Sequence, residues 1–159
     1  MDIEIIKNRK GGQKATDIPA EVLSLLNAGR IETVNLTEWL AVEHSQLVKS
    51  VFPALGIDKN IIEELVCQIH QQKKPSTMNT IRLIGALLYE KYVHTDLYEP
   101  LFKQLSTHLS DSVRCYACYL VALHTNTPLE DKLHKLKLLV VDSHFGVREI
   151  IWMAYYAPK

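Results

Sequence analysis

The chain has 159 residues, 47% of them apolar and 23% charged, and its 18 basic residues balance its 18 acidic ones. This composition is ordinary for a globular domain with its own core and excludes a disordered or linker-rich chain. Zero net charge gives no overall sign of a nucleic-acid binder, which usually shows a basic excess.

The sequence features that indicate cellular location and membrane association predict a cytoplasmic protein. The three cysteines form an odd set without the spacing of a disulfide framework, which suits a reducing compartment. The N-terminus lacks a signal-peptide pattern, and no apolar run approaches the roughly 18 residues of a membrane-spanning helix. We therefore expect no membrane association.

The N-terminal segment, residues 1–16, differs from the rest of the chain. The stretch from Lys7 to Lys14 is basic, contains Gly11 and Gly12, and has no apolar periodicity. We predict a short, flexible, basic N-terminal arm over residues 1–16. If nucleic acid is bound, the candidate phosphate contacts in this arm are Lys7, Arg9, Lys10 and Lys14.

From residue 17 onward, apolar residues recur at helical spacing, and we expect one α-helical domain over residues 17–159. Asp17 is predicted to cap the first helix, whose first turn holds Pro19, and Gly29 to end it.

Three more helices are expected in the first half. Asn35 and Glu38 resemble a capping box that opens a second helix running to Val51. Asp58 is predicted to cap the third helix. In the fourth, Gly85 leaves a small spot where a neighbouring helix could approach closely.

The second half of the sequence predicts four more helices, so the helices of the whole chain would form four pairs. Thr95 or Asp96 opens the fifth helix and Ser110 caps the sixth. The seventh is expected over residues 128–140, and Ser143 opens the last.

The last helix is apolar on almost every side, since it carries Ile150, Ile151, Trp152, Met153, Tyr155 and Tyr156. A terminal unit of a helical stack normally has a polar outer face. Three explanations stay open: burial inside the stack, contact with a partner or a second copy, or further repeats beyond it.

A β-branched residue followed by a cation recurs four times at near-constant spacing: Val48-Lys49, Ile81-Arg82, Val113-Arg114 and Val147-Arg148. The spacing of about 33 residues falls within the range of about 20 to 50 that is typical of solenoids, in which helix pairs stack and share a continuous core.

The run from Asp142 to Arg148, DSHFGVR, resembles the HEAT-repeat pattern, in which an aspartate in the turn precedes a Val-Arg pair opening the second helix. The resemblance covers roughly residues 19–157 and implies a right-handed α-solenoid of about four stacked antiparallel helix pairs. Only Asp142 fills the aspartate position; the other units have Glu43, Ser76 and His108 there.

No motif in the chain indicates catalysis, a cofactor or a metal. Cys115 and Cys118 have a two-cysteine spacing, but no second pair completes a zinc site, so we interpret both as core residues. The seven histidines are scattered, and neither a phosphate-binding glycine loop nor a GxSxG motif occurs. We therefore predict no catalytic residues, no metal ligands and no cofactor.

The cations of the recurring pairs are the candidate binding residues, together with the nearby Trp152: Lys49, Arg82, Arg114 and Arg148. One interpretation is structural, with each cation bonding turn carbonyls or an acidic residue of the neighbouring unit. The other is functional, with equivalent positions aligned as a positive stripe along the concave face of the solenoid.

Two functions follow from the resemblance. The first is a non-catalytic HEAT-like scaffold that binds a protein partner through its concave face or its apolar C-terminal helix, which could also form a homodimer. The second is a nucleic-acid-binding protein related to DNA alkylation-repair glycosylases. That family is built from HEAT-like helix pairs, and the chain is similar in repeat length and in having Trp152 close to Arg148 and Asp142.

Overall fold

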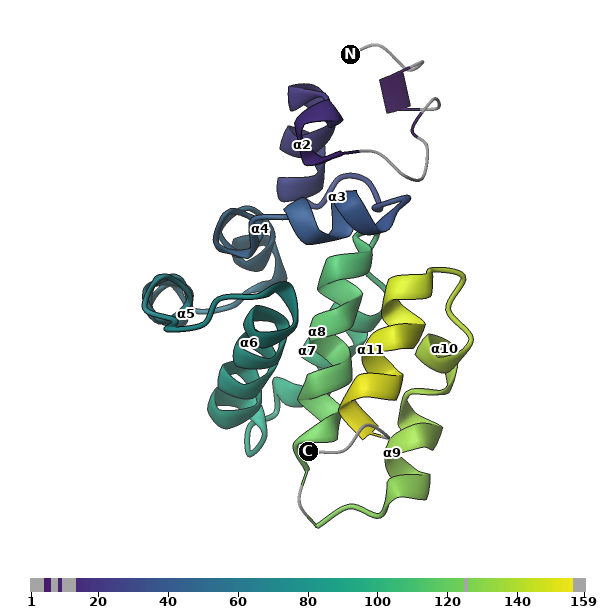
Figure 1. Cartoon of the computed structure of the whole chain (residues 1–159). Helices are drawn as coiled ribbons and strands as arrows, with labels where there is room; N and C mark the ends of the chain where they lie inside the picture. Colours follow the sequence, from purple (N-terminus) through teal and green to yellow (C-terminus); the bar gives the residue numbers. More distant parts are fainter. Residues whose placement is uncertain (1–4, 7–8, 10–13, 125, 156–159) are drawn as a thin grey trace. The chain divides into compact units, whose positions relative to one another are not determined.

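A computed structural model of the chain describes residues 5–6, 9, 14–124 and 126–155 (Figure 1). Within these ranges every regular element is helical and no strand occurs, which confirms the all-α prediction. None of the described helices combines the length and the apolar character needed to cross a membrane. The contacts divide the chain into two compact units, Met1–Thr77 and Met78–Lys159. The single domain expected over residues 17–159 stays a prediction.

Over residues 14–76, the first unit forms 3₁₀ helices and α-helices: η1 (Ala15–Asp17), α2 (Ala20–Asn27), α3 (Leu36–Ala41), α4 (His44–Val51), η2 (Phe52–Leu55) and α5 (Lys59–His70). Two predicted caps are confirmed. The Asn35 side chain accepts a hydrogen bond from the Glu38 amide, and Asp58 accepts one from the Asn60 amide. These side chains satisfy N–H groups that the first turn leaves without a backbone partner.

Glycine ends two helices of this unit in the left-handed conformation. Gly29 follows α2 with a φ of 69° and Gly56 follows η2 with a φ of 78°. The Gly29 amide donates to Leu26, and the next amide, that of Arg30, donates to Leu25. Both bonds close the helix end as predicted for Gly29, because a residue without Cβ adopts this conformation at little cost.

The expected first and second helices differ from the structure. Asp17 does not cap α2: it ends η1 and its carboxylate accepts the Lys14 amide, while Pro19 stands at the cap of α2. The second predicted helix is broken between α3 and α4. Asn27 of α2 accepts the Glu43 amide at 2.9 Å, which gives this N–H a partner outside the helix.

The core of the first unit forms where α2 packs against α4 and α4 against α5. Its members are fully or almost fully buried aliphatic and aromatic side chains: Val22, Leu26, Leu47, Val48, Phe52 and Leu65. Burying such groups is the main source of stability for a unit of this size.

The second unit is an array of α-helices: α6 (Thr77–Tyr92), α7 (Tyr98–Ser106), α8 (Asp111–Ala122), α9 (Leu129–Lys135), α10 (Lys137–Val140) and α11 (Phe145–Tyr155). Helix α6 begins at the boundary and is described with this unit. Helix α8 is central, since it packs against both α7 and α11 and each of its residues up to Val121 is buried (Figure 1).

Helix α6 approaches α8 closely at Gly85. A Cβ atom built on Gly85 would lie 2.4 Å from the Tyr119 Cβ, a distance that real atoms do not adopt. The prediction that Gly85 allows a close helix approach is therefore confirmed.

Two boundaries in this unit were predicted wrongly. Helix α7 begins at Tyr98 instead of at Thr95 or Asp96, because the Thr95 hydroxyl accepts the Leu97 amide in a turn before the helix. The seventh predicted helix is two helices, α9 and α10, that meet at the fully buried Leu136. Ser110 caps α8 as predicted, accepting the Val113 amide.

Candidate functional site

The turn before α8 is held by three side-chain contacts. His108 Nδ1 accepts the Ser110 amide at 3.0 Å, and Arg114 NH1 donates to the carbonyl oxygen of His108 at 2.8 Å. A second bond from NH1 reaches the Leu109 carbonyl. Burial and the nearby Arg114 cation lower the pKa of His108, which favours the neutral ring that can accept this hydrogen bond.

The turn before α11 repeats this arrangement, with Asp142 at the position equivalent to His108. Asp142 Oδ1 accepts the His144 amide at 2.9 Å, and Arg148 NH1 donates to the carbonyl oxygen of Asp142. His108 and Asp142 thus have the same role. In each, the side chain accepts a hydrogen bond that closes the turn, and the carbonyl oxygen accepts a hydrogen bond from an arginine. Histidine can take the position that aspartate has in the second turn because its unprotonated Nδ1 is also an acceptor.

Four contacts join one face of α8 to α11 and the turn before it. On α8 these contacts involve four residues, which follow one another at intervals of three, one and three positions: Asp111, Arg114, Cys115 and Cys118. Asp111 faces His144 Nε2 at 3.3 Å, and Arg114 binds the Asp142 carboxylate through Nε and NH2. Cys115 Sγ lies 3.9 Å from the Gly146 carbonyl, and the Cys118 carbonyl accepts the Tyr155 hydroxyl.

The equivalent positions on α11, found by aligning Arg148 with Arg114, are all exposed: Phe145, Arg148, Glu149 and Trp152. Phe145 is 40% exposed and Trp152 is 54% exposed. We call these four residues the outer face of α11. Phe145 and Glu149 were not predicted as site residues. Phe145 lies three residues before Arg148 and Glu149 lies three residues before Trp152, and this helical spacing is the signal that could have found them.

The opposite side of α11 is buried: Gly146, Val147, Ile150, Ile151 and Ala154. The helix is therefore apolar on nearly all sides for two reasons. One side packs on α8, and the other presents Phe145, Trp152 and the partly exposed Met153. Phe145 and Trp152 are thus exposed on the side of α11 that faces away from its buried residues.

The predicted row of cations has a different environment at each position. Arg114 is buried and bonds turn carbonyls and Asp142, as its structural interpretation expects. Arg148 is exposed and shares Asp142 with Arg114. Arg82 is exposed on α6, with its guanidinium carbon 5.8 Å from the ring centre of Tyr119, and Lys49 is exposed on α4 of the first unit.

Two members of the predicted arm, Lys7 and Lys10, lie outside the described residues. Arg9 forms an ion pair with Glu38 at 3.3 Å, with side chains 7% and 0% exposed, and also donates to the Glu32 carbonyl. Lys14 is exposed. Arg9 is therefore part of the packing of the first unit.

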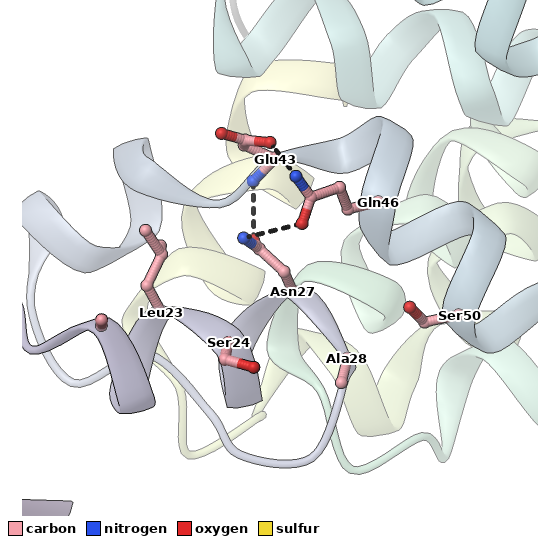
Figure 2. Close-up of a pocket in the computed structure, with 8 residues that line it drawn as sticks. Leu23, Ser24, Asn27, Ala28, Glu43, Gln46 and Ser50 are labelled. Carbon is pink, nitrogen blue, oxygen red and sulfur yellow. Dashed lines mark hydrogen bonds between the residues drawn. The ribbon is translucent and has the colours of Figure 1, made fainter.

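A cavity of about 410 Å³ lies between α2 and α4 in the first unit (Figure 2). Asn27 stands at its centre and donates to Gln46 Oε1 at 3.5 Å, and the Gln46 amide donates to the Glu43 carboxylate. Leu23 and small side chains, Ser24 and Ser50 among them, complete the lining. None of these lining residues pairs a nucleophile with a base, so the cavity offers polar contacts and no catalytic arrangement.

A second cavity, of about 450 Å³, lies near Tyr98, His124, Lys132 and Lys135 in the second unit. His124 Nε2 lies 3.0 Å from the Tyr98 hydroxyl, which donates to the Leu120 carbonyl. Burial, followed by Lys135 and Lys132, lowers the pKa of His124. Each lysine has a protein partner, because Lys132 donates to the Ala122 carbonyl and Lys135 pairs with Glu99.

Cys115 and Cys118 are free thiols in the core. Burial raises the pKa of both thiols, so neither is an activated nucleophile. In the part of the chain that the structure describes, no group of three or more His, Cys, Asp or Glu side chains could hold a metal ion.

Comparison with known proteins gives no match: no protein-family model, no curated protein and no solved structure. Statements about function therefore rest on the contacts of this chain.

Proposed function

We propose that the protein is a non-catalytic HEAT-like scaffold that binds a protein partner through the outer face of α11. The observation that carries this proposal is the pair of exposed aromatic side chains, Phe145 and Trp152, on the helix whose opposite side is packed on α8. Aromatic side chains and arginine are enriched at interfaces between proteins.

The recurrence of the turn contacts supports the HEAT-like part of the proposal. Each of the two turns has a side-chain acceptor and a hydrogen bond from an arginine to a carbonyl oxygen. From one turn to the next, the acceptor and the arginine are displaced along the sequence by the same number of residues. An equal offset is expected when successive units have the same fold. We extend this to a right-handed α-solenoid of about four stacked helix pairs as part of the same proposal.

Site-specific photo-crosslinking tests this function in cells that express the protein. A photoreactive amino acid at Trp152 should cross-link to another polypeptide, whereas the same group at Lys103, exposed on α7, should not. Cross-linking at position 152 that is no greater than at position 103 would remove the proposal. A substitution Phe145→Asp, combined with the probe at position 152, should reduce the cross-link by disturbing the same surface.

Nucleic-acid binding is the alternative proposal, and two observations weigh against it. Arg9 is paired with the buried Glu38, and Arg114 with Asp142, so two candidate phosphate-contacting cations are already neutralised. We expect no binding to a DNA duplex at about 50 mM salt. Tight binding that weakens steeply at about 200 mM would favour the alternative, because phosphate contacts release counterions. Release of an alkylated base from the duplex would make the protein an enzyme.

A further inference from the structure

The cavity between α2 and α4 has charge of one sign only. Among the described residues that line it, Glu43 is the single charged one, and no lysine, arginine or histidine is present. Glu43 is exposed to solvent. Its Oε2 atom accepts a hydrogen bond from the Gln46 side-chain amide, whereas its Oε1 atom has no hydrogen-bond partner within the described residues. The cavity therefore offers a carboxylate oxygen to a ligand.

Neutral oxygen atoms surround this carboxylate. Asn27 is only 7% exposed, and its side chain is held by the Glu43 amide at Oδ1 and by Gln46 Oε1 at Nδ2. These bonds place the Gln46 carbonyl oxygen beside the Glu43 carboxylate at one end of the cavity, as Figure 2 shows. A carbonyl oxygen has two lone pairs, and the hydroxyl groups of Ser24 and Ser50 accept hydrogen bonds as well. The lining thus suits a ligand rich in N–H donors.

The remaining lining is apolar, and it is formed by Leu23, Ala20 and Ala28. Leu23 is partly exposed on α2. A volume of about 410 Å³ lies within the range of small-ligand sites. Long cationic groups carry an aliphatic stem that packs on such apolar surface while the charged end stays among polar groups. The cavity therefore has room and contacts for both parts of such a group.

We propose that this cavity binds an organic cation, an ammonium or guanidinium group on an aliphatic stem, with the charge at Glu43 and the stem on Leu23. Both groups present only hydrogen-bond donors, which match the acceptors of the lining, whereas an anion would meet a carboxylate and no cation. The same chemistry occurs in a lysine or arginine side chain of another polypeptide and in a free amine. This site goes beyond the proposed function, which concerns α11.

NMR titration of the ¹⁵N-labelled protein tests the site, at constant chloride concentration and with each probe raised to about 50 mM. This range suits the millimolar dissociation constant expected when the ion pair is exposed. The cationic probes are N-acetyl-arginine amide, N-acetyl-lysine amide and butylguanidinium, and the neutral probe is N-acetyl-norleucine amide. We expect saturable shifts of the Asn27 and Gln46 side-chain amides and of the Glu43 backbone amide with the cations, and at least about 3-fold weaker binding of the neutral probe.

The order of the cations identifies their source. Tighter binding of the blocked amino acids than of butylguanidinium indicates a side chain of a polypeptide, and the reverse order indicates a free amine.

Two variants change the site itself. E43Q keeps the shape of the side chain and removes its charge, so it should raise the dissociation constant of N-acetyl-arginine amide at least about 3-fold. E63Q, at an exposed position of α5 outside the lining, is the matched control and should leave the constant unchanged. S50K places a lysine of the chain in the lining and should weaken binding by a similar factor, since it adds a like charge.

Three results would overturn the site: no shift of the Asn27 and Gln46 signals up to about 50 mM cation, equal binding of the neutral probe, or E43Q that binds as tightly as the wild type. Circular dichroism melting identifies a variant that fails to fold. If E43Q does so, S50K and the neutral probe decide, because Ser50 is exposed on α4.

Discussion

Both carboxylate oxygens of Asp142 accept hydrogen bonds from Arg114, which lies 28 residues earlier in the sequence. Nε donates to Oδ2 at 3.0 Å and NH2 donates to Oδ1 at 3.2 Å. Both side chains are largely buried. Because Asp142 also caps the turn before α11 and its carbonyl accepts Arg148, one residue connects α8, the turn and α11.

Replacing Arg114 by alanine should lower the free energy of unfolding by roughly 3 kcal/mol, because the Asp142 carboxylate loses its buried counter-charge. Urea denaturation followed by circular dichroism measures the change. Arg82→Ala is the control and should cost at most about 1 kcal/mol, since this side chain is exposed and lies over the Tyr119 ring. Equal effects of the two substitutions would mean that the Arg114–Asp142 pair does not join α8 to α11.

Gly85→Ala should destabilise the protein by about 1–3 kcal/mol, although alanine is the better helix former by about 1 kcal/mol. The new Cβ would lie 2.4 Å from Tyr119 Cβ and force α6 away from α8. Thermal melting of this variant beside Glu90→Ala, an exposed position on α6, separates the clash from helix propensity. A Gly85→Ala protein more stable than wild type would show that α6 and α8 do not approach so closely.

His44 should make stability depend on pH. Burial lowers its pKa from 6.5 to about 4, so the unfolded chain binds more protons between these values. Stability should therefore fall by up to roughly 3 kcal/mol as the pH drops from about 6.5 to about 4. Urea midpoints over this range should decline less steeply in His44→Gln. Parallel curves for the two proteins would contradict burial of a neutral His44, and any contribution from other histidines cancels in the comparison.

The thiols should differ sharply in reactivity. Cys67 is exposed, whereas Cys115 and Cys118 are buried with raised pKa values. At pH 8 a maleimide should label the native protein at Cys67, with Cys115 and Cys118 reacting at least about 100-fold more slowly until denaturant is added. Peptide mapping by mass spectrometry identifies the labelled sites. Native labelling of Cys115 would mean that α8 is accessible, contrary to its position in the core.

Local signals in the sequence located most helices. Asn35, Asp58 and Ser110 each cap the helix predicted for them, because a cap depends on a side chain and an amide only two or three residues apart. The break before Glu43 was not predictable in this way. Its amide is bound by Asn27, 16 residues earlier, and only the packing of α2 brings these groups together.

The candidate site shows the same division. The sequence identified Arg148 and Trp152 and the near-constant spacing of the β-branched–cation pairs, but it did not separate Arg114, which is buried and paired, from Arg148, which is exposed. Each of the two arginines follows a valine near the start of its helix. Their difference arises because α11 covers α8, whereas no described helix covers the outer face of α11.

By itself, the sequence determined that this protein is built of helices and roughly where they begin and end, since helix periodicity, caps and glycine ends act within a turn or two. The tertiary structure decided which cations are neutralised, which side of α11 is exposed, and that Phe145 and Glu149 belong with Arg148 and Trp152. Those properties depend on contacts between residues far apart in the chain, whose free energies are set by burial and geometry that no local pattern contains.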